Sequence, residues 1–283
     1  MTHAELMPGQ KIQYLVFTDM DGTLLDHHTY SHAPVTETLK QLKQRKIPVI
    51  PNTSKTFEEM VELRKEIGLT GPFIVENGAA IYIPHGFFKT KPANTQWLNN
   101  HWVRQFTSKK SHWLSLLKRI EKDFENQFTY FSKMTTKQIC DVTGLSEKEA
   151  KRAANRQFGE PVLWLGDEQE KQRFLNAITS IGARPLIGGR FLHVSGECDK
   201  GAAMNWLVKE FSRQFPNLHC HSIALGDGQN DAAMLEAANI AVRVTSPVNP
   251  PPTLKKTKNV YTSELHGPEG WAQTIKQILT NTL

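Results

Sequence analysis

The sequence has few cysteines, no long apolar run and no leader-like start. Its 283 residues include three cysteines, Cys140, Cys198 and Cys220, which form no CxxC pair and are odd in number. We therefore expect reduced thiols in a cytoplasmic protein rather than a disulfide scaffold. No apolar run approaches the ~20 residues of a membrane span. Residues 1–10 lack the basic start and apolar core of a signal peptide, so no membrane association is expected.

The sequence also lacks a recognisable nucleic-acid-binding motif, although its formal net charge is +6. Because no motif accompanies the local basic pairs, we interpret them as solvated helix faces and expect no nucleic-acid partner. A mildly positive field favours a small anionic substrate instead. The basic pairs are Lys109-Lys110, Lys118-Arg119, Lys151-Arg152 and Lys255-Lys256.

Two carboxylates follow the first expected strand. Residues 14–18 are mostly β-branched, aromatic or apolar, which is typical of a buried parallel strand. The run stops at Asp19 and Asp21, with Met20 between them and Gly22-Thr23 after them. Two acids one residue apart in an extended chain point to the same side. At the carboxyl end of a strand in an α/β sheet, they lie where such folds bind ligands.

Strands and helices alternate up to residue 84 and again after residue 195. This alternation predicts an α/β fold with a doubly wound, mainly parallel sheet of the Rossmann type. We therefore predict a catalytic core formed by residues 1–84 and 196–283. Its expected strands cover 14–18, 47–50, 73–75, 79–83, 221–225 and 240–244, and its expected helices cover 34–45, 56–67, 199–214, 232–238 and 271–279.

The segment between the two halves of the core, residues 85–195, has a different texture. Residues 92–104 are polar and aromatic without a clean period, so no element is predicted there. The remainder predicts an inserted α+β domain, with helices at 111–128, 134–143, 146–157 and 168–181 and strands at 161–165, 183–187 and 191–195.

Three more polar motifs stand at the ends of expected core elements. Thr53-Ser54-Lys55 follows the second strand, and Lys200 begins the helix after the insertion. A lysine in the first turn opposes the helix dipole, which favours a functional reason for Lys200. The last motif, Gly226-Asp227-Gly228-Gln229-Asn230-Asp231, ends a late strand. Its glycines let the backbone turn sharply.

In this order, the four motifs resemble those of the haloacid-dehalogenase superfamily of phosphohydrolases. The resemblance implies that Asp19 is the nucleophile and forms an acyl phosphate. Asp21 then protonates the leaving oxygen and activates water. It further implies that Thr53 holds a phosphate oxygen and that Lys200 pairs with Asp19 and the transferring group.

The same resemblance implies a Mg²⁺ cofactor, which offsets repulsion between a carboxylate nucleophile and a phosphate ester. Its ligands are expected to be the Asp19 carboxylate, the backbone carbonyl of Asp21 and Asp227. Asn230 and Asp231 are expected to complete or orient this set.

An insertion between the second motif and Lys200 is the site of the larger, C2-type cap in this superfamily. Several segments resemble those of mannosyl-3-phosphoglycerate phosphatases, which form mannosylglycerate. The resemblance implies a substrate with a phosphate, a carboxylate and a sugar. The resembling segments are Thr53-Ser54-Lys55, Glu76-Asn77-Gly78, Gly188-Gly189-Arg190-Phe191 and Gly267-Pro268-Glu269-Gly270-Trp271.

The resemblance assigns substrate-binding roles to residues of these segments. Arg190, with Gly188 and Gly189, is expected to bind the carboxylate. Lys55 is expected to add positive charge on the core side. Glu76 and Asn77 are expected to hydrogen-bond sugar hydroxyls.

Other functions stay open at this point. The motifs also suit a general sugar-phosphate phosphatase of the Cof or sucrose-phosphatase type. A phosphomutase or a non-catalytic ligand-binding protein could retain the same residues. The sequence does not determine the oligomeric state.

Overall fold

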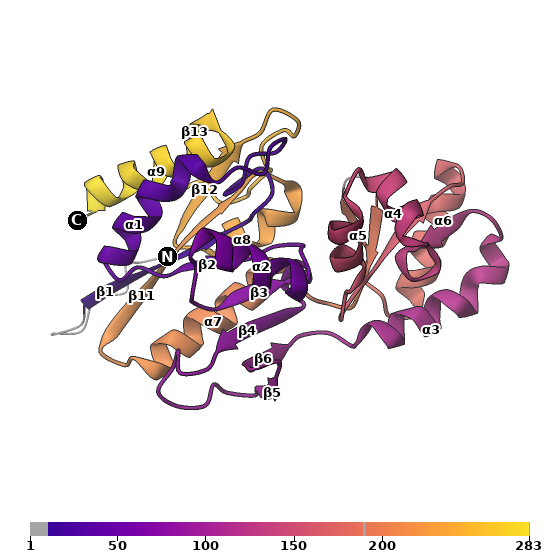
Figure 1. Cartoon of the computed structure of the whole chain (residues 1–283), viewed down its shortest axis with the longest axis horizontal. Coiled ribbons are helices and arrows are strands. Elements are labelled where there is room, and N and C mark those ends of the chain that lie inside the picture. The colour runs from indigo at the N-terminus through magenta and orange to yellow at the C-terminus, as the bar shows by residue number, and fades with distance from the viewer. Residues whose placement is uncertain (1–10, 189–190, 283) are drawn as a thin grey trace.

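The computed structural model describes residues 11–188 and 191–282 and shows a larger and a smaller lobe (Figure 1). The larger lobe is built on a five-stranded sheet in the order β13-β12-β11-β1-β2, with every neighbouring pair parallel. The five strands, in sheet order, are Val260–His266, Ile240–Thr245, Leu218–Gly226, Lys11–Thr18 and Val49–Pro51. None of the described helices is long and apolar enough to span a bilayer.

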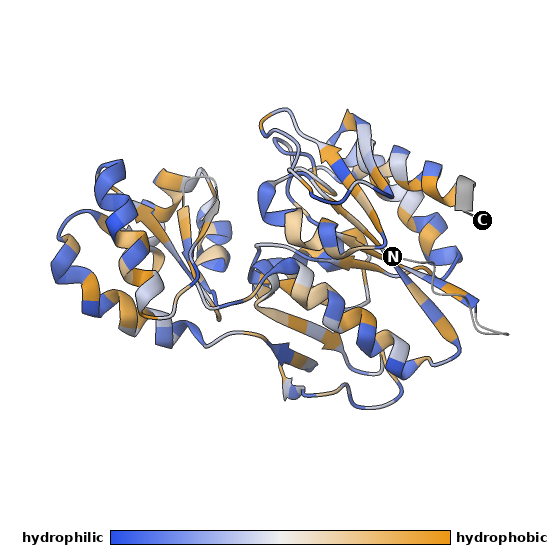
Figure 2. Cartoon of the chain, turned by 180° about the vertical axis from the view of Figure 1, so that it is seen from behind, coloured by the Kyte–Doolittle hydropathy of each residue, from blue (hydrophilic) through white to orange (hydrophobic). Residues whose placement is uncertain are grey.

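Helices cover both faces of this sheet, so strand β1 is buried on both sides. Tyr14 and Val16 of β1 pack with α1, α2 and α9, whereas Leu15 and Phe17 pack with α7 and α8. Figure 2 shows the result, with hydrophobic strands inside and hydrophilic outer helix faces. The helices are α1 (Thr36–Gln44), α2 (Phe57–Ile67), α7 (Lys200–Gln214), α8 (Ala232–Ala237) and α9 (Gly267–Thr282). The predicted doubly wound, mainly parallel fold is confirmed.

A second sheet extends the larger lobe, in the order β3-β4-β6-β5 with antiparallel pairs. A parallel bridge between Asn52 and Ile74 joins it to β2. Its strands are Phe73–Val75, Ala80–Pro84, His101–Gln105 and Gln96–Leu98. We expected residues 85–195 to form the insertion. Because β6 pairs with β4, the chain instead passes to the smaller lobe after Gln105.

The smaller lobe has a four-stranded antiparallel sheet in the order β7-β8-β10-β9. Helices α3 and α6 pack with it in one apolar cluster, and α4 and α5 form a second cluster with Phe191. The strands are β7 (Phe128–Tyr130), β8 (Glu160–Trp164), β9 (Leu186–Gly188) and β10 (Phe191–Val194). The helices are α3 (Lys110–Ile120), α4 (Thr136–Thr143), α5 (Glu147–Ala154) and α6 (Glu168–Ser180).

Some predicted elements differ from the observed ones. The helix expected over 111–128 ends at Ile120, and the chain then forms a 3₁₀ turn and β7. Strand β13 was not predicted, so 240–244 is not the last strand of the sheet. By contrast, α2 lies where the sequence predicted a helix, and Thr56 caps it in a capping box with Glu59.

Candidate active site

The parallel pairing of β1 with β11 brings the two acidic motifs together. Thr18 lies opposite Leu225, and the backbone N–H of Asp19 donates to the Leu225 carbonyl at 2.9 Å. Asp19 therefore follows β1 beside the point where Gly226 and Asp227 end β11. The side chains of Asp19 and Asp227 are buried. The strand-end placement expected from the sequence is thus what the structure shows.

Lys200 forms the central ion pairs of this region. Its Nζ lies 2.6 Å from Asp19 Oδ1 and 2.6 Å from Asp231 Oδ1. Gly201 allows this approach, because a Cβ there would lie 2.4 Å from the Ala233 carbonyl oxygen of α8. Burial lowers the pKa of Lys200, but the two carboxylates outweigh this and raise it above its ordinary value. Lys200 therefore carries its charge inside the protein.

Asp227 is oriented by neutral side chains. The Thr23 hydroxyl donates to Asp227 Oδ1 at 2.8 Å, and the Asn249 amide lies 3.5 Å from Oδ2. Gly22 has φ +71°, and a Cβ at this position would lie 2.8 Å from Asp227 Oδ2. A glycine is therefore needed where the turn after Asp21 passes this carboxylate.

The carboxylates of Asp19, Asp227 and Asp231 fit a divalent cation. One oxygen from each lies within 4.8 Å of the others, and all three residues are buried. Burial raises the pKa of Asp19 to about 7 despite the opposing effect of Lys200. Burial also raises the pKa of Asp227 and of Asp231. Lys200 pairs with Asp19 and Asp231, so the three buried acids carry surplus negative charge, and oxygen ligands of this kind suit Mg²⁺.

The metal-free protein is expected to lose stability as the pH rises. The pKa of Asp19 is 3.8 in the unfolded reference and about 7 in the folded protein, so folding favours the protonated carboxyl between these values. The contribution of Asp19 to the unfolding free energy therefore falls across this window and stays low above it. Urea unfolding in chelator at about pH 5 and about pH 8 measures the change. Asp19→Asn is expected to reduce this difference in unfolding free energy between the two pH values. An equal difference in the variant would contradict the assignment of the pH dependence to Asp19.

Asp21 and Lys55 form a second ion pair beside the buried acids. Lys55 Nζ lies 2.8 Å from Asp21 Oδ1, and the side chain of Asp21 is 38% exposed. The same Nζ lies 5.3 Å from the centre of the Tyr30 ring. Thr53 is fully buried, and its hydroxyl accepts a hydrogen bond from the Lys55 N–H at 3.2 Å. Asp21 is thus the more accessible of the two motif acids.

Glu76 contacts the smaller lobe rather than open space. Its carboxylate accepts hydrogen bonds from the backbone N–H groups of Gln157, Phe158 and Gly159 at 2.7, 3.1 and 3.0 Å. The Arg156 guanidinium lies 3.4 Å away. Glu76 is 4% exposed, so its acceptor sites are occupied in this arrangement.

The other predicted substrate residues lie in different surroundings. Asn77 follows Glu76 in a left-handed turn with φ +58°, and its backbone N–H donates to the Thr53 carbonyl at 2.9 Å. Asn230 lies in the turn after β11, and its amide oxygen packs closely over Gly228. A Cβ on Gly228 would lie only 2.5 Å from this oxygen. Gly188 ends β9, whereas Gly189 and Arg190 lie outside the described residues.

Comparisons with known proteins found a matching family and relatives of nearly full length. Residues 16–96 match the family described as haloacid dehalogenase-like hydrolase. A glucosyl-3-phosphoglycerate/mannosyl-3-phosphoglycerate phosphatase of Methanococcoides burtonii is 33% identical, over 95% of this chain and 98% of the relative. A protein of the same description from Persephonella marina is 30% identical, over 94% of this chain and 97% of the relative. The chain belongs to the haloacid dehalogenase-like hydrolases. It is a phosphoric monoester hydrolase.

Two solved structures share the fold of this hydrolase. A haloalkanoate-superfamily phosphatase from Bacteroides thetaiotaomicron has a TM-score of 0.65 at 16% identity, covering 97% of this chain and 98% of its own. The sucrose-phosphatase of Synechocystis, solved with sucrose and phosphate, has a TM-score of 0.59 at 13% identity, covering 94% of this chain and 98% of its own.

Sequence reasoning missed several residues that position the site of this hydrolase. Asn52 is fully buried, and its amide donates to the Lys200 carbonyl at 2.9 Å. Asn52 could have been found from its position, as a polar residue at the end of a buried strand, and Thr23 from the Asp-Gly-Thr motif. No sequence pattern marked Asn249 or Arg156, because their partners lie far away in the sequence.

We expect Glu76→Gln to weaken the contact between the lobes. The new amide keeps one accepting oxygen, but its NH₂ would face at least one of the three backbone N–H donors. Unsatisfied buried groups cost about 1–3 kcal/mol of folding free energy. Chemical denaturation measures this loss. Glu58→Gln is the matched control, since exposed Glu58 accepts a hydrogen bond from Asn155 across the same boundary. Equal effects of both changes would contradict an anchoring role for Glu76.

Proposed function

We propose that this hydrolase is a Mg²⁺-dependent phosphatase that converts a glucosyl- or mannosyl-3-phosphoglycerate to the glycosylglycerate and phosphate. The observation that carries the proposal is the buried group of Asp19, Lys200, Asp227 and Asp231 at the end of β1 and β11. Two relatives of nearly full length support the substrate, because their descriptions name these compounds. Mannosylglycerate is the product inferred from the sequence motifs.

The chain's own residues divide the work of the reaction. An oxygen of Asp19 attacks phosphorus, and the bond from phosphorus to the glycerate oxygen breaks. Asp21, the more exposed acid, gives its proton to that leaving oxygen. Asp21 then takes a proton from the water that attacks the acyl phosphate, which releases phosphate and restores Asp19. Lys200 and the Thr53 hydroxyl hold oxygens of the transferring group.

Three groups would hold Mg²⁺: the carboxylates of Asp19 and Asp227 and the backbone carbonyl of Asp21. When bound, the ion would supply positive charge that offsets repulsion between these acids and the phosphate ester. Asp231 orients the set, because one of its oxygens pairs with Lys200 and the other accepts from the Gly228 N–H at 3.0 Å. Asn230 is placed in the same turn.

The substrate roles are proposed residue by residue. Lys55 adds positive charge beside Asp21 and the leaving group. Arg190, with Gly188 and Gly189, stays the proposed ligand of the substrate carboxylate on sequence grounds, and Asn77 that of a hydroxyl. For Glu76 we now propose an anchoring role instead of sugar binding, because the backbone of residues 157–159 occupies its carboxylate.

Phosphate release from a panel of esters, with Mg²⁺ or chelator, tests this function. We expect activity only with the metal, and a higher kcat/KM for glycosylated 3-phosphoglycerates than for sugar phosphates such as sucrose phosphate. A general sugar phosphatase would show no such preference, and Mg²⁺-independent turnover would contradict the metal role. Phosphate transfer to a second hydroxyl would indicate a mutase.

Cytoplasmic location stays a prediction from the cysteines. Cys140, Cys198 and Cys220 are free in the structure.

A further inference from the structure

A cavity of about 510 Å³ lies beside the Asp21–Lys55 pair, within the size range of small-molecule sites. It is lined by the loop that includes Tyr30, by Lys55, by α2, and by Leu145, Glu149 and Arg152 of the smaller lobe. Both lobes therefore contribute to its wall. Asp21, the proposed acid for the leaving oxygen, lies next to the cavity because its ion-pair partner Lys55 lines the wall.

Tyr30 is an unusual residue for a surface loop. It is 49% exposed, and its backbone has φ +57°, a left-handed conformation that is rare for an aromatic residue. The loop is held in place by Asp26, whose Oδ1 accepts from the N–H groups of His28 and Thr29 at 3.1 and 2.7 Å. The chain thus maintains an exposed ring in a strained position next to a cavity, where packing alone gives no reason for it.

The charge of the cavity limits what it accepts. Four carboxylates, among them Glu59 and Glu149, line it, against two permanent cations, Lys55 and Arg152. A second phosphate group would be repelled here. A neutral group with hydroxyl donors and an apolar ring face suits carboxylate acceptors and an aromatic surface. A sugar ring has these properties.

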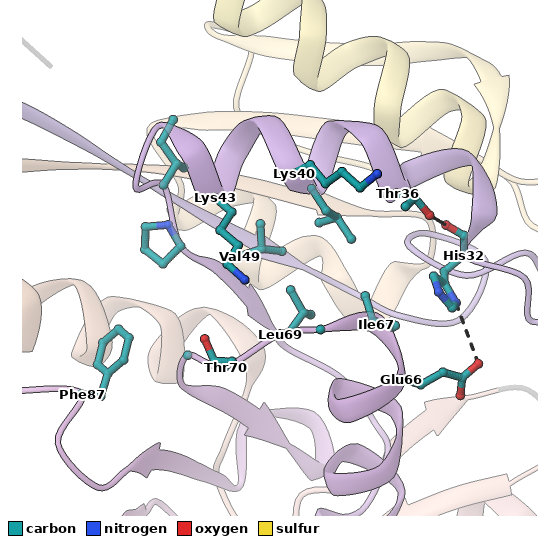
Figure 3. Close-up of a pocket in the computed structure, with 15 residues that line it drawn as sticks. His32, Thr36, Lys40, Lys43, Val49, Glu66, Ile67, Leu69, Thr70 and Phe87 are labelled. Atoms are coloured by element: carbon teal, nitrogen blue, oxygen red, sulfur yellow. Dashed lines mark hydrogen bonds and ion pairs between the residues drawn. The ribbon is translucent and has the colours of Figure 1, made fainter.

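A second cavity of about 340 Å³ adjoins the cavity at Tyr30. Figure 3 shows it, with His32 pointing toward Glu66, and their atoms lie 4.0 Å apart. Both residues line both cavities, so the pair stands between them. The far cavity is lined by Lys43 and by apolar residues such as Leu39 and Val49, and it contains none of the site acids.

We infer that the cavity at Tyr30 is the subsite for the sugar of the substrate, an inference that rests on the function proposed above. The Tyr30 ring stacks on the sugar, and Lys55 lies between this ring and Asp21, on the side of the leaving group. Glu149 of α5 faces the sugar from the smaller lobe. A phosphate ester without a sugar leaves this subsite empty and does not need Tyr30.

Steady-state kinetics of Tyr30→Leu test the inference. The change is expected to raise KM for mannosyl-3-phosphoglycerate about tenfold, the effect of one good apolar contact. The kinetics with 3-phosphoglycerate, the same ester without the sugar, should not change. Tyr30→Phe keeps the ring and should restore the wild-type KM. Lys43→Ala, which alters only the far cavity, is the matched control and should change neither substrate.

Three outcomes separate the possibilities. Equal losses on both substrates would make Tyr30 a structural residue of the loop and overturn the inference. An unchanged preference for the glycosylated ester in Tyr30→Leu would overturn the cavity assignment alone. If the wild-type enzyme itself shows no such preference, the proposed substrate fails and the inference fails with it.

Discussion

Asp19→Asn is expected to lower phosphate release by about 10⁴-fold or more, the scale seen when a covalent nucleophile is removed. The amide is nearly the same size, and it cannot form the acyl phosphate. The protein should stay folded, because Lys200 keeps its pair with Asp231 at 2.6 Å and one buried charge is removed. Initial rates with saturating ester and Mg²⁺ measure the effect.

The control for this variant is Asp141→Asn, an exposed aspartate of α4 in the smaller lobe. It makes the same chemical change away from the site and should leave the rate unaltered. Full activity of Asp19→Asn would show that another group attacks phosphorus.

Lys200→Met is expected to have the largest effect on stability. The side chain of Lys200 is fully buried between Asp19 and Asp231. Removing it leaves two buried carboxylates without their cation, and breaking a buried pair in this way costs about 3–5 kcal/mol of unfolding free energy. Activity should also fall by about 10²–10³-fold, because a positive group aimed at the transferring phosphate is lost.

A second variant separates the two effects of Lys200. Lys200→Met combined with Asp231→Asn removes one of the orphaned charges, so it should regain part of the stability without regaining activity. Lys40→Met, at an exposed lysine that pairs with Glu37, is the matched control. Wild-type stability and turnover in Lys200→Met would contradict both the stabilising and the catalytic role proposed for this lysine.

The sequence predicted the part of the site that follows from strand order. Asp19 and Asp227 each stand just past an apolar run, and parallel strands end on the same edge, so their meeting needed no knowledge of side-chain contacts. For Lys200, the family resemblance implied a pair with Asp19, and the misfit of a lysine in the first turn of a helix favoured a functional reason. The structure places its Nζ 2.6 Å from Asp19 and from Asp231, and its catalytic role stays a prediction.

Other elements were hidden because their partners are distant. Glu76 follows a core strand, like a ligand residue, but its contacts come from residues 156–159, about 80 positions later. The β5–β6 hairpin was missed although Asn99 and Asn100, both with positive φ, form a turn that asparagine favours. Strand β13 lies at the sheet edge with several polar, exposed residues, so its pattern was weak.

A burst experiment on Asp21→Asn tests the central claim, that Asp19 attacks and Asp21 completes the reaction. p-Nitrophenol leaves without needing an acid, so p-nitrophenyl phosphate should still phosphorylate this variant. We expect one equivalent of p-nitrophenol per enzyme, then almost no turnover, and a phosphoryl group on the Asp19 peptide by mass spectrometry. Steady turnover without a burst, or a phosphoryl group on another residue, would contradict it.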